Sequence, residues 1–380
     1  MSNKAIFLIT MVICVTGCTR QPDPTMVSSP PADPVVNVYG KWIKESDGTI
    51  MQDPQTSGLT LWQDKLVSIS DGSALPHQQR RLHLIEPASA TLAPAGAQMT
   101  MDYTVRRSCF SEYLANEPDL EAIVADPADP NVFYTVTEDA TRTGALSMRC
   151  QQKYQDTGST DYPSLLLRLQ LNDSGETHIT HVRPLQFPAQ LNVGNFPNDG
   201  IEGLAMAEDR TLYIGLEKDA AGLPRIFTVT LDEEFWKTQY FAEVQDPGLK
   251  LPVYQQGNHP INGLAYYKPE NSDNHYLLAA ARNDNELWII DAAGRLPART
   301  VLMRFYAPVE QRGADCEAAE LMDNASIEGL VVAGNTLWMV NDPWKVNYLK
   351  NLQCPSNQPH YEAMAPLLFG VELQNHWFEG

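Results

Sequence analysis

Oxygen-bearing side chains stand at one position of a short phrase that occurs five times in this chain. In each phrase such a residue precedes Gly or Ala and then Leu or Ile, and a strand-like run, a polar turn and a second strand-like run follow. This pattern predicts a β-hairpin, and its return roughly every 60 to 80 residues predicts a repeat fold. The five phrases begin at Ser57, Glu121, Glu202, Asn262 and Glu328.

These five residues have the chemistry of a hard-cation site. If the hairpins converge, three carboxylates come close together, and leaving them dry and ionised without a partner would cost several kcal/mol. A divalent cation removes that cost, and Ca²⁺ accepts carboxylate, amide, hydroxyl and water oxygens in loose geometry. His and Cys are missing from these positions, which disfavours zinc or copper. The sequence predicts one Ca²⁺ here, with a water-filled polar channel as the alternative.

A second set of charged residues lies at the end of the second strand of each hairpin. Four are acids and one is Arg282, which could neutralise its neighbours or meet an anionic ligand at the mouth of a channel. A ring of salt bridges without any ligand is an equally open interpretation. The set consists of Asp71, Glu138, Glu217, Arg282 and Asp342.

Repeated hairpins of this kind predict an all-β fold, a five-bladed β-propeller with up to four strands in each blade. The fourth strands of the first and third repeats are expected at residues 98–105 and 238–244. The last repeat ends with a third strand at 367–373, so the N-terminal run 37–44 is expected to complete that blade and close the ring. Long helices are not evident. Six blades, with one degenerate or built from residues 141–162, are the alternative.

The first seventeen residues read as a targeting segment. Lys4 precedes an apolar run from residue 5 to 15 that is too short for a permanent membrane span, and Val15-Thr16-Gly17-Cys18 follows. This resembles a bacterial lipoprotein signal peptide, with Cys18 as the acylated N-terminus and an outer-membrane location. An ordinary secretory signal is the alternative. Residues 18–34 are rich in Pro, Ser, Asp and Thr and predict a disordered tether, which leaves 35–380 as the propeller domain.

The charge balance limits the partners of the chain. It has 27 basic against 47 acidic residues, a formal net charge of −20, and 43% hydrophobic residues, enough for a large core. An acidic surface repels nucleic acid, so we expect no nucleic-acid partner, and it attracts cations. The predicted partners are the membrane, through the lipid on Cys18, and a protein or small phosphorylated ligand at the channel mouth.

Four cysteines follow Cys18 in a chain that is expected to be exported to an oxidising compartment. Two local disulfides are expected, Cys109 with Cys150 and Cys316 with Cys354, because each pair brackets one hairpin of the repeat. A zinc site is the weaker interpretation, since neither a CxxC motif nor a matched His pair is present.

The phrases SGL, EAI, EGL, NGL and EGL resemble those of the bacterial SdiA-regulated propeller family and, more loosely, of the esterase-like phytase propellers. The order of Ser, Glu, Glu, small polar residue and Glu is also similar to that of the five-bladed calcium-activated nucleotidases (apyrases), whose channel holds Ca²⁺. The resemblance covers residues 57–342. It implies the fold and the metal rather than an activity, and Asn262 and Arg282 depart from it, because the families more often have a small hydroxyl residue and an acid there.

Two functions remain open. The first is an envelope-anchored, calcium-bound propeller that acts as a binding or scaffolding module, which the acidic charge and the sparse basic residues favour. The second is a Ca²⁺-dependent phosphoester hydrolase, phytase-like or nucleotidase-like, in which the metal polarises a phosphate. The sequence contains no GxSxG elbow, P-loop or HExxH motif. Whether the protein is an enzyme is not decided by its residues.

Overall fold

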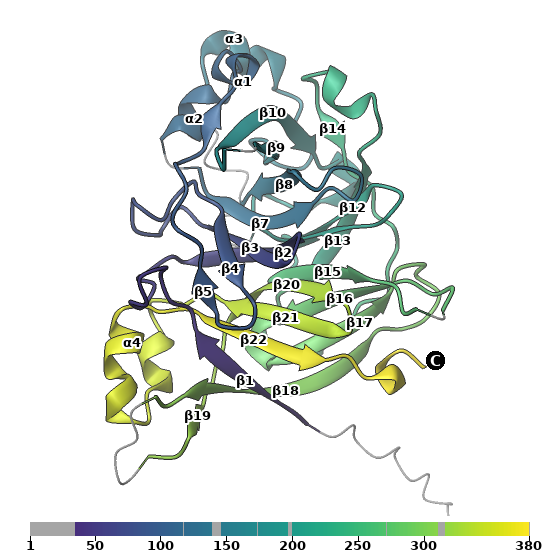
Figure 1. Ribbon diagram of the computed structural model, residues 1–380. Coiled ribbons are helices and arrows are strands. Elements are labelled where there is room, and N and C mark those ends of the chain that lie inside the picture. Colours follow the sequence, from purple (N-terminus) through teal and green to yellow (C-terminus); the bar gives the residue numbers. More distant parts are fainter. Residues whose placement is uncertain are drawn as a thin grey trace, which may run out of the picture. The chain divides into compact units, whose positions relative to one another are not determined.

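Short antiparallel sheets make up most of the regular structure in a computed structural model of the chain (Figure 1). The chain divides into two units, Met1–Asp33 and Pro34–Gly380. The expected signal peptide, Cys18 and the tether lie outside the described residues. In the part that is described, none of the helices is both long and apolar enough to cross a membrane. The structure describes residues 35–116, 118–138, 146–172, 174–196, 200–270, 272–310 and 316–379.

Each predicted hairpin forms the inner part of one sheet. The first sheet contains β2 (Thr56–Trp62), β3 (Lys65–Ser70), β4 (His83–Glu86) and β5 (Thr91–Leu92), and the second contains β7 (Leu120–Ala125), β8 (Val132–Thr137), β9 (Leu165–Leu171) and β10 (Thr177–Gln186). The third contains β11 (Ile201–Met206), β12 (Thr211–Leu216) and β13 (Arg225–Thr230). The fourth contains β15 (Gly263–Tyr267), β16 (Tyr276–Ala281), β17 (Glu286–Asp291) and β18 (Arg299–Pro308), and the last β20 (Ile327–Ala333), β21 (Thr336–Asn341) and β22 (Leu367–Glu372).

The remaining elements are short and lie in the connections. The strands are β6 (Thr100–Met101), β14 (Ala242–Glu243) and β19 (Ala319–Leu321), and the α-helices are α1 (Tyr103–Arg106), α2 (Ser111–Ala115), α3 (Met148–Lys153) and α4 (Gln358–Glu362). Single turns of 3-10 helix occur at Ala189–Leu191, Phe235–Lys237, Arg282–Asp284, Tyr348–Asn351, Pro355–Asn357 and Asn375–Trp377. The expected absence of long helices is confirmed for the described ranges, where the longest α-helix has 6 residues.

The N-terminal strand β1 (Val36–Trp42) completes the last sheet, as predicted for residues 37–44. Gly40 pairs with Phe369 of β22 in antiparallel register, and Figure 1 shows β1 beside β22 and β18. The first half of β1 also pairs with β18 in parallel, with Tyr39 opposite Tyr306. Strand β1 therefore joins the fourth and last sheets, and the predicted closure by the N-terminal strand is confirmed.

The inner strands β2, β7, β11, β15 and β20 contact one another in this order, and β20 also contacts β2. Small residues permit the close approach. A Cβ on Gly58 would lie 2.4 Å from the backbone nitrogen of Ile123, and one on Gly329 would lie 2.6 Å from the backbone carbonyl carbon of Gly58. The described inner strands thus form a closed cycle, as in a propeller. The cycle supports the expected number of five blades, and that number stays a prediction.

Both faces of most inner and second strands are covered, because each sheet packs between two others. Every residue of β8, β11 and β16 is buried. This is why these strands do not show a strict alternation of apolar and polar residues.

The two expected fourth strands differ from the prediction. The first sheet ends with β5, not with residues 98–105, and β6 within that range pairs in parallel with β10 of the second sheet. Within 238–244, β14 also pairs with β10, while the third sheet gains only an isolated bridge between Thr228 and Gln245. Strand β10 has 10 residues and exceeds its partner β9, so its outer edge accepts both short strands.

Both predicted disulfides are confirmed. Cys109 is bonded to Cys150 with 5.6 Å between their Cα atoms, and Cys316 is bonded to Cys354 with 5.7 Å. The first ties the chain between α1 and α2 to α3, and the second ties the segment before β19 to the segment before α4. These sulfur atoms are therefore not zinc ligands.

Candidate functional site in the channel

Bulges at the start of the inner strands aim the candidate acids away from the sheet ladder. The register of β11 with β12 shifts between Ile201 and Gly203, and that of β20 with β21 shifts between Ile327 and Gly329, which leaves Glu202 and Glu328 unpaired. In β7 the shift follows Glu121 directly. A bulge of this kind re-aims a side chain, here toward the space that the inner strands enclose.

The residues Ser57 and Asn262 are held differently. In β2 the register shift follows Ser57, whereas β15 pairs regularly with β16 and Asn262 precedes it, with its backbone N–H bonded to Ala280 at 3.0 Å. Both side chains are buried. The Ser57 Oγ and both polar side-chain atoms of Asn262 lack a hydrogen-bond partner among the described residues.

The two predicted sets meet in one cavity of about 420 Å³. From the first set it is lined by the three acids, and from the second set by all five residues, while Ser57 and Asn262 lie outside its lining. Uncharged polar groups and one indole contribute as well. The complete lining is Gln55, Asp71, Gly72, Ser73, Asp119, Glu121, Glu138, Glu202, Glu217, Lys218, Asn258, Arg282, Asn283, Glu328, Asp342 and Trp344.

One side of this cavity is neutralised by Arg282. Its guanidinium donates hydrogen bonds to Glu328 and, at 3.3 Å, to Glu217, and it lies 5.8 Å from the centre of the Trp344 ring. Burial lowers the pKa of Arg282, but the carboxylates of Glu328 and Glu217 outweigh it and raise that pKa above its ordinary value. Arg282 therefore takes the first of its two expected roles, the neutralisation of neighbouring acids.

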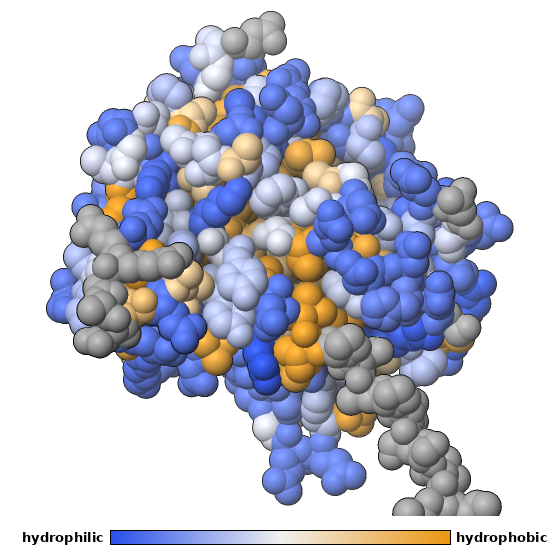
Figure 2. Space-filling model, turned by 60° about the horizontal axis from the view of Figure 1, so that its bottom comes forward, coloured by the Kyte–Doolittle hydropathy of each residue, from blue (hydrophilic) through white to orange (hydrophobic). Residues whose placement is uncertain are grey.

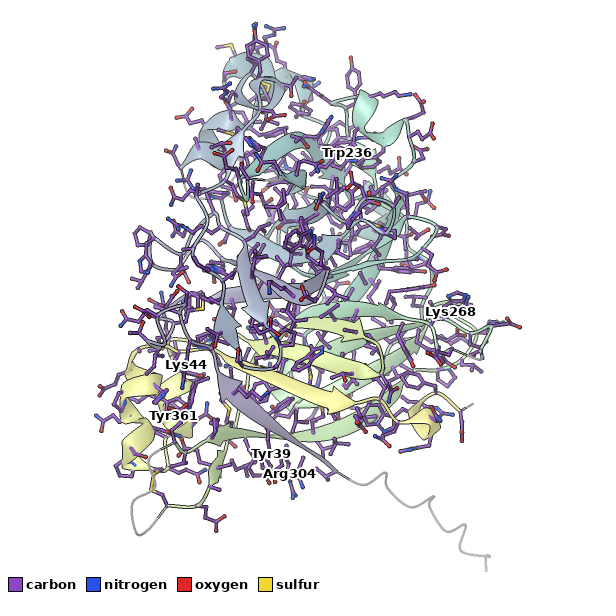
Figure 3. The ribbon with its side chains drawn as sticks, in the orientation of Figure 1. Tyr39, Lys44, Trp236, Lys268, Arg304 and Tyr361 are labelled. Atoms are coloured by element: carbon purple, nitrogen blue, oxygen red, sulfur yellow. A yellow bond between two sulfur atoms is a disulfide. The ribbon has the colours of Figure 1, made fainter. Side chains whose placement is uncertain are left out.

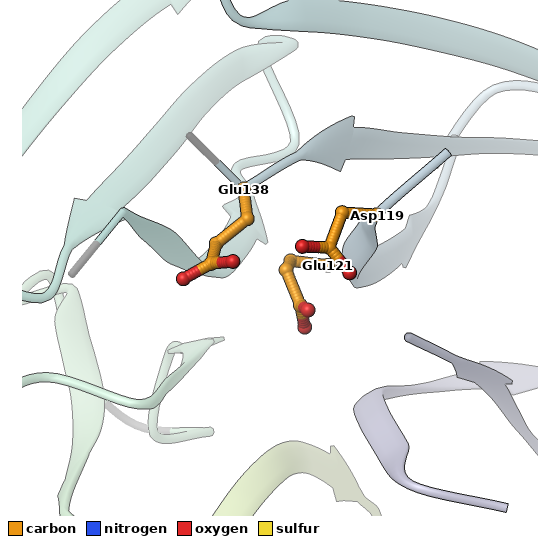
Figure 4. Close-up of side chains that lie close together, drawn as sticks. All are labelled: Asp119, Glu121 and Glu138. Atoms are coloured by element: carbon orange, nitrogen blue, oxygen red, sulfur yellow. The ribbon is translucent and has the colours of Figure 1, made fainter. Parts of the chain in front are cut away.

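On another side, three carboxylates converge. One oxygen from each of Asp119, Glu121 and Glu138 lies within 4.8 Å of the others, and all three residues are buried (Figure 4). Asp119 accepts a hydrogen bond of 2.7 Å from the backbone N–H of Gly72. The Oε2 atom of Glu121, a residue only 5% exposed, has no hydrogen-bond partner in the described part of the chain.

Asp119 was not among the residues that the repeated phrase singled out. It precedes β7, outside the phrase that begins at Glu121. The available signal was the spacing, because residues two apart on an extended chain point to the same side. Asp119 and Glu121 have that spacing.

Burial and mutual repulsion raise the pKa values of five acids in the cavity. Burial is the main cause for Glu121, Glu202 and Glu328, whose pKa values lie well above the ordinary one. Burial and then Asp71 raise the pKa of Asp342 to about 8, and burial and then Asp119 raise that of Asp71 to about 6. Near neutral pH the cavity therefore retains protons that a bound cation would displace.

The donors present fit a hard cation. They are carboxylate oxygens with amide and hydroxyl groups nearby, and the cavity lining contains neither His nor Cys. The unpartnered buried oxygens Glu121 Oε2 and Asp342 Oδ1 are groups whose burial costs free energy unless a proton, a water or a cation satisfies them. This is the structural argument for a metal.

No family model and no curated protein sequence matches this chain. Solved structures with a similar backbone fold include the allergen Mala s 1 of Malassezia sympodialis. It has 10% identity over 86% of this chain and 96% of that one, with a TM-score of 0.46. The chain is a β-propeller. A GH43 endo-arabinanase from Bacillus licheniformis (12% identity, 88% and 98% coverage, TM-score 0.42) and a putative oxidoreductase (glucose dehydrogenase) from Thermus thermophilus (10%, 88% and 100%, 0.39) are similar too.

These likenesses are too distant to assign an activity to the propeller, and its fold rests on the sheets described above. The resemblance to the SdiA-regulated and phytase families stays a prediction.

Proposed function

We propose that this propeller binds calcium in its channel and acts as a binding or scaffolding module at the cell envelope. The observation that carries the proposal is the convergence of Asp119, Glu121 and Glu138, with ligand oxygens within 4.8 Å of one another. The unpartnered Glu121 Oε2 supports it independently. In this proposal Glu202 lies nearby as a further acid of the same cavity.

This proposal puts the cation nearer to β7 than the sequence alone implied. A ring of five ligands would put it on the channel axis, but Arg282 holds Glu328 and Glu217, and its positive charge repels a second cation there. Calcium is favoured over magnesium because Ca²⁺ tolerates irregular sets of six to eight oxygens, whereas Mg²⁺ demands near-ideal octahedral geometry. Water would supply the remaining ligands.

Calorimetric titration tests the metal. The chain beginning at Thr19 retains every described contact, since all of them lie in Pro34–Gly380. We expect heat from Ca²⁺ binding with the wild type, and at least a tenfold loss of affinity for Glu138→Gln. Glu233→Gln, at an exposed acid outside the cavity, is the matched control and should bind normally. The absence of calcium heat from the wild type, together with a melting temperature that calcium does not raise, would refute the proposal.

The envelope location rests on the residues Val15 to Cys18, and mass spectrometry of the mature N-terminus tests it. A role in binding is supported by the rim of the cavity, where Trp344 is 37% exposed beside the amides of Asn258 and Asn283. Aromatic and amide groups of this kind contact ligands in many recognition sites. The ligand proposed at this mouth is a protein segment or a small phosphorylated molecule.

Phosphoester hydrolysis is the second candidate, favoured by the presence of Lys218 and Arg282 in the same cavity as the acids. The contacts of Arg282 with Glu328 and Glu217 weigh against it, because an anionic substrate would have to compete with two carboxylates. Assays with nucleotides, phytate and simple phosphate esters, in calcium and in chelator, decide. Calcium-dependent release of phosphate that Glu138→Gln abolishes would establish the hydrolase.

A further inference from the structure

The two strands β1 and β18 form a parallel ribbon on the outside of the propeller, and its exposed side chains share an unusual character. Along β18 the exposed positions include Leu302 and Arg304, and along β1 they include Tyr39 and Lys41. Exposed and buried residues alternate in both strands, so these side chains point to the same outer side. These four are aromatic, aliphatic or basic, and the other exposed positions of the two strands are Asn37, Arg299 and Thr300.

Register places these residues together. Tyr39 lies opposite Tyr306, and the two rings stack with centroids 4.9 Å apart. Arg304 lies opposite Asn37, the residue two before Tyr39. Figure 3 shows Tyr39 and Arg304 next to each other, where β1 enters the fold. Tyr39, Lys41, Leu302, Arg304 and Tyr306 thus form a continuous stripe, which we call the outer stripe.

Large apolar groups in the outer stripe are unusually accessible. Tyr39 is 61% exposed and Leu302 is 45% exposed. Figure 2, which turns this side of the propeller forward, shows hydrophobic surface among the hydrophilic residues. An exposed apolar patch bordered by polar groups marks an interaction surface more often than a single exposed residue does.

The charge of the outer stripe is opposite to that of the chain. Although the chain has 47 acidic residues, neither β1 nor β18 contains one. The strands that pair with them supply two accessible acids, Glu286 of β17, which is half-buried opposite Leu302, and Glu372 at the end of β22. Asp291 and Glu320 on these strands are buried. Arg304 makes no ion pair with any described residue, while Lys41 donates to the backbone oxygen of Ala88 at 2.7 Å. A positive, partly apolar strip therefore interrupts an acidic surface.

We propose that the outer stripe rests on a lipid surface with anionic headgroups and turns the propeller to a fixed orientation there. Tyrosine rings favour the boundary between lipid and water, and basic side chains beside them are attracted to anionic headgroups. Beyond a Debye length of about 8 Å the remaining negative charge is screened, so the local charge of the stripe decides which face approaches.

The position of the outer stripe fits this partner. This argument rests on the proposed acylation of Cys18, which leaves residues 19–34 between the lipid and the fold. If these residues form the disordered tether that their composition predicts, their root-mean-square reach is roughly 22 Å. The chain enters the fold at β1, so the face that carries the outer stripe is the one held closest to the bilayer.

Vesicle sedimentation tests the proposal without the lipid anchor. The chain beginning at Thr19 is mixed with phosphatidylcholine vesicles, with and without phosphatidylglycerol. We expect binding to the anionic vesicles that is lost in high salt. Arg304→Gln should weaken it about fivefold, the effect of one basic residue near an anionic surface. Lys268→Gln is the matched control, because Lys268 is exposed and lies away from the stripe (Figure 3), and it should bind like the wild type.

Tyr39→Ser provides a second variant and should weaken binding in low and high salt alike. Three outcomes would each overturn the proposal. They are equal binding to neutral and anionic vesicles, equal loss of binding for Lys268→Gln and Arg304→Gln, and dimerisation that Tyr39→Ser abolishes. Failure of the proposed function is recognised separately. Missing acylation of Cys18 refutes only the anchor, and missing calcium heat refutes only the metal site, since neither enters the vesicle measurement.

Discussion

A buried carboxyl group either keeps its proton or needs a positive charge beside it. The acids of the channel differ in whether such a charge is present. Glu328 and Glu217 have Arg282 as their partner. The charged neighbours with the largest effects on the pKa of Glu121 are all acids, and they raise it further. The difference predicts which acids respond to metal and which respond to loss of the arginine.

Replacement of Glu121 by Gln should have opposite effects with and without calcium. In chelator, the variant should be more stable than the wild type by about 1 kcal/mol, because one repelling acid is removed. In calcium, its melting temperature should no longer rise. Differential scanning calorimetry in both buffers measures this. A calcium-induced rise equal to that of the wild type would show that Glu121 is not a ligand.

Replacement of Arg282 by Met should leave two buried carboxylates uncompensated. Removal of one partner of a buried ion pair typically costs about 3 to 5 kcal/mol. Urea unfolding in chelator measures the loss. Lys237→Met is the control, since the pair of Lys237 with Glu234 is exposed and such pairs contribute about 1 kcal/mol or less. Similar losses for both variants would contradict the assigned role of Arg282.

At the scale of elements, the inner strands are close enough for glycine to be required. Gly58 has a φ of +71° and lies against the backbone of β7, whereas Gly334 has a φ of +60° and open space around it. Both substitutions to Ala incur the cost of a left-handed conformation, about 1 to 2 kcal/mol. Only Gly58→Ala also forces two inner strands apart.

We therefore expect Gly58→Ala to be destabilising by about 3 kcal/mol or more, and Gly334→Ala by about 1 kcal/mol. Chemical denaturation of the two variants, compared with the wild type, gives the difference. An equal loss for both would mean that contact between β2 and β7 is looser than the backbone geometry indicates.

Elements with a strong pattern could be predicted from the sequence, and weak ones could not. Strands β8, β12 and β16 were expected as the second strands of their hairpins, because each lies between clusters of turn residues. Strands β5 and β6 have two residues each, and a pair shows no periodicity. Their places depend on free edges in neighbouring strands, a tertiary effect that overrides local preference.

The candidate site shows the same limit. The bulged acids Glu202 and Glu328 could be located because they stand inside the repeated phrase. Asp119 lies outside that phrase, and only the fold brings it to Glu138. The two predicted sets of residues were assigned from alignment of the repeats. Such an alignment contains no information on how far each side chain reaches into the channel. Residues of both sets line one cavity because Glu and Arg side chains are long enough to reach from one set to the other.

At the scale of the whole molecule, the acids of the channel link stability to pH. The pKa of Asp342 is about 8 in the folded chain against an ordinary value of 3.8, and that of Asp71 is about 6. Between the ordinary value of 3.8 and these raised pKa values, the folded state retains protons that the unfolded state has released. Stability is therefore greatest at the acid end of this window and falls as the pH rises toward 8.

We expect the melting temperature in chelator to decrease from about pH 5 to pH 8, and this slope to flatten in calcium, which binds the ionised acids. At calcium concentrations 100-fold above the dissociation constant, the gain is about 2.7 kcal/mol. Thermal melts across this range measure both effects. A slope that calcium leaves unchanged would show that the titrating acids and the metal site are separate.

The pairing of Gly40 with Phe369 also determines when the propeller can finish folding. This contact joins residues that are far apart in the sequence. Such pairing forms slowly, because the entropy of closing a long loop is lost before the contacts that stabilise it can form. If the chain is exported as proposed, with the N-terminus leading, β1 emerges early and stays without its partner β22 until the end of the process. Its unpaired edge invites aggregation in that interval, so a chaperone that shields strand edges would raise the yield of folded protein.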